Sequence, residues 1–240
     1  VAYPELAYPT YEVGAILAGA QTAATDRLDV LGAAPVRLIW VNSPANPTGR
    51  VLSVEQLRAI VDWARDRGAI VASDECYLEL GWEPDAAPIS ILHPSVCGRS
   101  HDGLLAVHSL SKRSNLAGYR AGFVTGDPGL VAELLEVRKH AGFMVPTPVQ
   151  AAMVAALGDR DHVKQQRERY RGRREALWAA FRAAGFRIDH SSAGLYLWAA
   201  VDVWRHVRLR QQQRWGWLYA APLLMAAVIL GLRSLRGIYI

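Results

Sequence analysis

Four short apolar runs, typical of buried strands, alternate with helical patterns through the first half of the chain. The runs cover residues 36–41, 69–72, 104–107 and 121–124. Strands that alternate with helices form mostly parallel sheets, because each crossover helix packs back on the sheet. The sequence therefore predicts an α/β fold, in which a mostly parallel sheet is sandwiched by helices.

Helix boundaries are marked by capping residues. Ser53 and Gln56 form a capping-box pattern, and Gly68 ends the helix that follows it. Further helices are expected to begin at Asp127-Pro128 and Thr147-Pro148, since a proline fits the first turn of a helix. A long charged helix is expected over 161–184.

The second half of the chain suggests a change of domain. Residues 186–189 and 195–198 are expected to be two strands of a different, smaller unit. The 240 residues suit one large domain and part of another. We expect an incomplete large domain over 1–160, an interdomain helix and the start of a small α/β domain over 161–200, and an atypical tail over 201–240.

The net charge of the whole chain comes from the tail. Residues 201–240 contain six arginines and one aspartate, which account for the formal net charge of +5. The remaining residues are neutral overall, and this excludes the main argument for a nucleic-acid partner.

Within the tail, residues 215–232 are uncharged and flanked by arginines. Three interpretations stay open: a sequence foreign to the domain, from a frameshift or fusion, a buried apolar helix, or a membrane anchor at the short limit of length. Membrane contact through 215–232 is not the favoured one.

Two cysteines, Cys76 and Cys97, lack the paired spacing of a disulfide framework or a metal site. They suit a reducing compartment, and the opening residues VAYP show no secretion signal. We expect a cytoplasmic protein without a bound metal, and a chain that starts inside a longer one.

Polar and ionisable side chains follow the first three predicted strands. Since ligands bind at the carboxyl ends of the strands in open α/β sheets, these side chains are expected to converge on one crevice. Each alone has an ordinary explanation as a turn, cap or surface residue. The residues are Asn46, Asp74, Tyr77, Ser109 and Lys112, with Arg120 eight positions further on.

Jointly these residues match the needs of pyridoxal 5'-phosphate (PLP). A lysine can form a Schiff base with its aldehyde, and a carboxylate can keep its pyridine nitrogen protonated. An amide and a phenol suit its ring oxygen, while a hydroxyl and a guanidinium suit its phosphate.

Longer segments resemble the class I and II aminotransferases of PLP fold type I. The resemblance covers about residues 1–200 and rests on NPTG (46–49), SDECY (73–77), HSLSKRSNLAGYRAGF (108–123) and GLYLW (194–198). Within that family the chain is most similar to succinyldiaminopimelate aminotransferases of lysine biosynthesis, through YPELAYPTYEVGA (3–15) and RKHAGFMVPTPVQAAM (138–153).

The resemblance implies a role for each candidate. Lys112 would be the catalytic Schiff-base lysine and proton shuttle, and Asp74 the partner of the pyridine nitrogen. The other cofactor-binding residues would be Asn46 and Tyr77 at the ring oxygen, Ser109 and Arg120 at the phosphate, and Tyr8 stacked on the ring.

From the resemblance, two family features are expected to be missing from this sequence. The chain begins after the glycine-containing phosphate loop, and the tail replaces the segment that supplies the substrate-carboxylate arginine. We therefore expect transamination between an amino acid and a 2-oxo acid in a homodimeric full-length enzyme, but impaired activity in residues 1–240 alone. The alternatives are a PLP-dependent β-lyase and a non-catalytic, possibly membrane-associated remnant.

Overall fold

The computed structural model describes residues 1–142 and 144–200 and contains a six-stranded sheet with strand order β2-β1-β3-β4-β5-β6. The strands pair in parallel except β6, which runs antiparallel to β5. The predicted mostly parallel sheet is thus confirmed. Its strands are β1 (Ala2–Tyr3), β2 (Ala23–Ala24), β3 (Leu38–Asn42), β4 (Ile70–Asp74), β5 (Leu104–Ser109) and β6 (Gly122–Gly126).

The four predicted strands correspond to β3, β4, β5 and β6, with ends shifted by one or two residues. The shifts run toward the carboxyl ends, because backbone pairing continues into the polar residues that follow each apolar run. The pairing of Asn42 with Asp74 is an example. Strands β1 and β2 were not predicted, since two residues are too few to show a strand pattern.

Helices pack on both faces of the sheet. Ile39 and Val41 of β3 point into the core shared with α2 (Val54–Arg65). Trp40, between them, faces the other way and stacks on Tyr11 of α1 (Thr10–Leu17), with ring centroids 4.8 Å apart. The alternation of side chains along a strand therefore gives β3 two buried faces.

Helix α2 begins at the predicted capping box, in which Ser53 and Gln56 exchange side-chain and backbone hydrogen bonds. Its residues Leu57 and Val61 are almost fully buried. Burying each such side chain contributes about 1.5–3 kcal/mol. The chain turns at Gly68, whose φ of +60° favours glycine.

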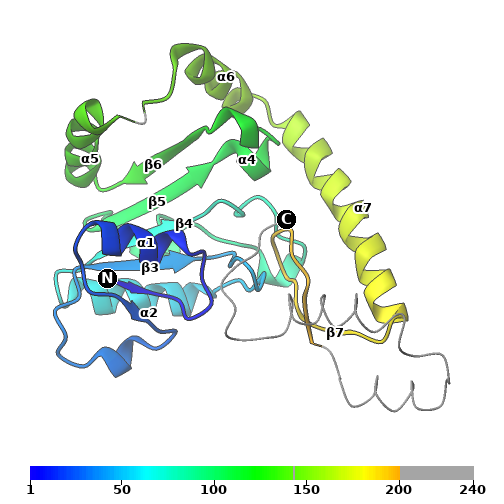
Figure 1. The fold of residues 1–240 in the computed structure, drawn as a ribbon, viewed down its shortest axis with the longest axis horizontal. Coiled ribbons are helices and arrows are strands. Elements are labelled where there is room, and N and C mark those ends of the chain that lie inside the picture. The colour runs from blue at the N-terminus through cyan, green and yellow to red at the C-terminus, as the bar shows by residue number, and fades with distance from the viewer. Residues whose placement is uncertain (143, 201–240) are drawn as a thin grey trace.

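Of the remaining helices, α5 and α6 lie near β6, and α7 leads away from the large sheet to β7 (Figure 1). Asp127 caps α5 by accepting hydrogen bonds from two backbone amides, as its sequence position predicts. The long helix α7 runs from α6 to β7, on the side toward which β3, β4 and β5 point (Figure 1). The elements are α3 (Pro94–Cys97), α4 (Leu110–Arg113), α5 (Pro128–Ala141), α6 (Thr147–Gly158), α7 (Asp161–Ala183) and the 3-10 turns η1 (Leu28–Leu31), η2 (Pro84–Ala86) and η3 (Ala117–Tyr119).

A separate two-stranded antiparallel sheet follows α7, formed by β7 (Arg187–His190) and β8 (Trp198–Ala200). The predicted strand at 195–198 is wrong in its extent, because only Trp198 belongs to β8. The preceding residues 192–194 hydrogen-bond to loops of the large sheet, as in the bond from the Ala193 amide to the Gly49 carbonyl.

Among residues 1–142 and 144–200, no helix combines the length and apolarity needed to cross a membrane. The uncharged run at 215–232 lies outside the described residues.

Candidate active site

The Asn42 side chain connects the carboxyl ends of β3 and β4 through hydrogen bonds. Its side-chain amide donates to the main-chain oxygens of Pro44 (3.0 Å) and Asp74 (3.1 Å). Its Oδ1 accepts a hydrogen bond of 2.7 Å from the backbone amide of Asn46. Asn42 therefore holds the predicted Asn46 turn beside the predicted Asp74.

Asp74 is oriented by two donors. Its Oδ2 accepts a hydrogen bond from the Tyr11 phenol (2.7 Å), and its Oδ1 accepts one from the Cys76 amide (3.1 Å). Burial raises the pKa of Tyr11 far above its ordinary value, and the charge of Asp74 raises it further, so the phenol stays protonated and donates. Stacking on Trp40 holds the Tyr11 ring in place.

Lys112 lies on the short helix α4, directly after β5. Ser109 caps this helix, because its Oγ accepts a hydrogen bond from the Ser111 amide (3.1 Å). Leu110 is completely buried and anchors the helix to the sheet, where its amide donates to the Ala121 carbonyl. The Lys112 side chain is half-buried.

The pairing of β4 with β5 brings these side chains to one edge of the sheet, because Asp74 pairs with Val107, two residues before Ser109. The pKa of the nearby Cys76 thiol is raised to about 12 by burial and by the charge and hydrogen bond of Asp74. A hydrogen bond with Ser109 and the positive charge of Lys112 act in the opposite direction. The side chains of Asp74, Ser109 and Lys112 thus all influence the pKa of one thiol at the carboxyl edge of the sheet.

Tyr77 is buried, and its hydroxyl lies 3.2 Å from the hydroxyl of Tyr196. Burial raises the pKa of Tyr77, and the contact with Tyr196 raises it further. Tyr77 belongs to the SDECY motif and Tyr196 to the GLYLW motif, but no role was predicted for Tyr196 from the sequence.

Two of the predicted site residues, Tyr8 and Arg120, are exposed to solvent. The Tyr8 ring is 39% exposed and meets the edge of the Tyr11 ring at a centroid distance of 6.3 Å. Arg120 is exposed, has a φ of +53° and donates to the Ala117 carbonyl (2.9 Å). Their assignment to the ring face and the phosphate stays a prediction.

Glu75 is a buried carboxylate next to Asp74. Its Oε1 accepts hydrogen bonds from Ser90 Oγ (3.0 Å) and the Ile91 amide (2.8 Å). Its Oε2 lies 3.8 Å from His108 Nε2. Burial raises the pKa of Glu75 and lowers that of His108, so both groups are shifted toward their neutral forms.

Comparison with known proteins identifies the family of the chain. The model of the class I and II aminotransferases matches residues 1–225. The chain belongs to this family. The match extends into residues 201–225, which belong to the tail that is atypical in charge and composition.

The relatives of this class I and II aminotransferase chain support the assignment. Over 199 residues, it is 66% identical to a probable aminotransferase of Mycobacterium tuberculosis and 62% identical to the 4-dedimethylamino-4-oxo-anhydrotetracycline transaminase OxyQ of Streptomyces rimosus. Each alignment covers 83% of this chain, and 47% and 55% of the relatives. The chain therefore spans about half the length of these relatives.

Solved structures give the same fold. The N-succinyldiaminopimelate aminotransferase of Mycobacterium tuberculosis superposes with a TM-score of 0.72 at 28% identity, over 80% of this chain and 53% of that one. The similarity to this group of aminotransferases, expected from the sequence, is thus present in the fold.

The class I and II aminotransferases depend on PLP. The donor set at the ends of β4 and β5 fits this cofactor, because Lys112 supplies an amine, Asp74 a carboxylate and Ser109 a hydroxyl. In the part of the chain that the structure describes, no group of three or more His, Cys, Asp or Glu residues could hold a metal ion.

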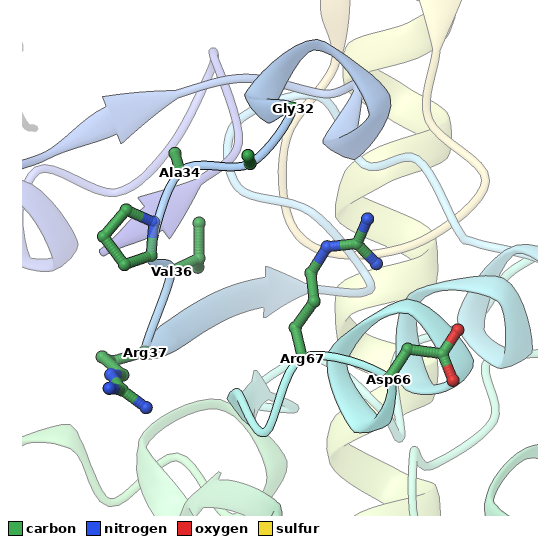
Figure 2. A pocket seen from close by; sticks show the side chains of 8 residues that line it. Gly32, Ala34, Val36, Arg37, Asp66 and Arg67 are labelled. Carbon is green, nitrogen blue, oxygen red and sulfur yellow. The ribbon is translucent and has the colours of Figure 1, made fainter.

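A pocket of about 690 Å³ lies elsewhere, at the start of β3 and the end of α2. Figure 2 shows Arg67 extending from the end of α2 toward the loop that contains Gly32 and Ala34. The pocket contains none of the predicted site residues, which follow the opposite ends of the strands. It is therefore separate from the candidate active site.

Proposed function

We propose that the protein transfers an amino group between an amino acid and a 2-oxo acid, with PLP bound at the carboxyl edge of the large sheet. The observation that carries this proposal is that Asp74 and Ser109 end the paired strands β4 and β5, and that Ser109 caps the helix on which Lys112 lies. These residues come from the ends of β4 and β5 and from α4, so the sheet itself holds them together.

When bound, PLP supplies an aldehyde that bonds to amines and a ring that accepts electron density from the substrate α-carbon. We assign Lys112 to the covalent attachment of this aldehyde and to proton transfer at the α-carbon. The capped helix fixes the backbone of Lys112 directly after the end of β5.

Asp74 would hold a proton on the pyridine nitrogen through a charge-assisted hydrogen bond. The donors Tyr11 and Cys76 keep the carboxylate in one orientation, and each of its oxygens retains further acceptor capacity. Tyr11 is therefore assigned as a positioning residue for Asp74.

The remaining candidates are proposed to bind the rest of the cofactor. Asn46 and Tyr77 would donate to the ring oxygen, and Ser109 and Arg120 to the phosphate. Tyr8 would cover the ring face, since its exposed ring lies beside Tyr11, the partner of Asp74.

We propose both a general substrate class and a more specific substrate. An amino acid and a 2-oxo acid follow from the family, while N-succinyldiaminopimelate in lysine biosynthesis is a finer proposal supported by sequence motifs and by fold similarity at 28% identity. The more similar Streptomyces rimosus relative is named for an anhydrotetracycline, so a polycyclic ketone belongs in the same substrate panel.

We further propose a cytoplasmic homodimer, with the division into a cofactor-binding domain over 1–160 and the start of a smaller domain over 161–200. The antiparallel pair of β7 and β8, which is separate from the large sheet, supports this division.

The test is amino-group exchange between glutamate and a panel of 2-oxo acids, in full-length enzyme saturated with PLP, since residues 1–240 alone are expected to be impaired. We expect turnover that is lost in Lys112→Ala and kept in the matched control Lys139→Ala, an exposed lysine paired with Glu136. Equal loss in both variants, or turnover that survives Lys112→Ala, would contradict the proposal. Release of ammonia and a 2-oxo acid from a β-substituted amino acid, without exchange, would indicate a β-lyase.

A further inference from the structure

Two tyrosines that are 119 positions apart meet at their hydroxyl groups. The oxygens of Tyr77 and Tyr196 lie 3.2 Å apart, and the rings meet edge to face with centroids 6.0 Å apart. Tyr77 is 5% exposed, so water has little access to this contact. Tyr77 follows β4 at the candidate active site, whereas Tyr196 precedes β8 of the smaller sheet.

The backbone before Tyr196 is tied firmly to the loops of the active site. Trp82 Nε1 donates to the Gly194 carbonyl (2.8 Å), and the Gly194 amide donates to the Leu80 carbonyl (2.9 Å). At Gly49, in the NPTG turn, an added Cβ would lie 2.6 Å from the Ala193 carbonyl oxygen. This close approach fixes the position of the 191–196 segment along the loop.

Helix α7 supports the same segment from the other side. Arg174 donates to the Ser191 carbonyl (2.7 Å) and to its Oγ (3.0 Å), and Ser191 Oγ donates to the Tyr196 carbonyl (3.2 Å). Tyr196 therefore reaches Tyr77 from a segment that the protein holds on both sides.

The contact restricts the direction of the hydroxyl protons. Each phenol has one proton to donate and can also accept. Burial raises the pKa of Tyr77, which keeps its proton in place. The contact raises the pKa of Tyr77, as donation from Tyr77 to Tyr196 would, and the 3.2 Å distance also allows the reverse direction. Where a third group accepts the Tyr77 proton, Tyr196 can donate to Tyr77, and a bond in such a chain strengthens the next one.

We infer that Tyr196 is a positioning residue, which donates to Tyr77 and thereby directs the Tyr77 proton to the ring oxygen of PLP. The inference rests on the proposed function, since it takes Tyr77 as the partner of that oxygen. It links the segment before β8 to the electronic state of the cofactor, because a donated hydrogen bond favours the deprotonated form of the oxygen.

The test measures the pH midpoint of the visible absorbance band of bound PLP. Tyr77→Phe is expected to raise this midpoint, and Tyr196→Phe to raise it by a smaller amount. The double variant should match Tyr77→Phe alone, because Tyr196 acts only through Tyr77. The matched control is Tyr170→Phe, since Tyr170 packs in the same apolar cluster but its hydroxyl contacts Asn115.

The outcomes distinguish the inference from the proposed function. A shift in Tyr77→Phe with none in Tyr196→Phe would overturn the inference and leave the proposed function intact. No shift in either variant would overturn both the inference and the role of Tyr77. Additive shifts, or a Tyr196→Phe chain that fails to fold, would show that the Tyr196 hydroxyl has an independent or purely structural role and would also overturn the inference.

Discussion

The phenol of Tyr11 donates a hydrogen bond of 2.7 Å to Oδ2 of Asp74, although 63 positions separate the two residues. Tyr11 lies on a helix that covers one face of the sheet, and Asp74 ends a strand of that sheet. The packing of α1 is thereby coupled to the orientation of the carboxylate assigned to the pyridine nitrogen.

Tyr11→Phe is expected to destabilise the fold while keeping the stacked ring. A hydrogen bond to a charged group contributes about 1.5–3 kcal/mol, and its loss should lower the free energy of unfolding by that amount. Urea unfolding followed by tryptophan fluorescence measures the change. Tyr119→Phe, which alters an exposed tyrosine, is the control and should unfold like the parent protein. Equal stability of Tyr11→Phe and the parent would show that this bond contributes nothing.

Asp74→Asn should retain PLP on Lys112 and lose turnover by about 100-fold or more, because the amide cannot stabilise a protonated pyridine nitrogen as a carboxylate does. Steady-state exchange rates at saturating substrate test this, together with the absorbance of the bound cofactor. Asp66→Asn, at the other end of the sheet, should exchange at the parent rate. Near-parent turnover in Asp74→Asn would mean that another carboxylate serves the nitrogen.

Glu75 should make stability depend on pH. Its pKa is raised in the folded protein, so it contributes stability that is present below its unfolded value of 4.5 and is lost as pH rises through the folded value. Glu75→Gln keeps an acceptor for Ser90 and Ile91 but does not titrate. The free energy of unfolding of the variant minus that of the parent should therefore be larger at pH 8 than at pH 5. Urea unfolding of both proteins at the two pH values measures this difference. A difference that is independent of pH would contradict this account.

The Cys76 thiol should be unreactive in the folded protein. A rise of its pKa from 9.0 to about 12 reduces the thiolate fraction. Alkylation by iodoacetamide at pH 8 should accordingly be about 1000-fold slower than in the protein unfolded by urea. Peptide mass spectrometry distinguishes Cys76 from Cys97. Rapid alkylation of folded Cys76 would show that the thiol is not buried.

The parts of the site that depend on local pattern could be predicted from the sequence. Asp74 and Lys112 follow apolar runs, and ligands bind at the carboxyl ends of parallel strands, so both residues are expected at one edge of the sheet. The capping box at Ser53 and the proline after Asp127 locate two helices in the same way, because the signal for each lies within a few residues.

The supporting residues could not be predicted in this way. Tyr11, Asn42 and Tyr196 act through contacts between distant segments, and nothing in their neighbouring residues marks those contacts. Tyr11 lies three positions after the predicted Tyr8, on a helix too short to show its buried face clearly. The extent of β8 was missed because residues 195–197 belong to the loop before it, and pairing with β7 begins only at Trp198.

The identity of the lysine that carries PLP is the central claim, and covalent labelling tests it most directly. The protein is saturated with PLP, reduced with borohydride, digested and mapped by peptide mass spectrometry. The account predicts that the pyridoxyl group is found on Lys112, and that Lys112→Ala is not labelled at an equivalent level elsewhere. A pyridoxyl group found mainly on another lysine, such as Lys139 or Lys164, would contradict it.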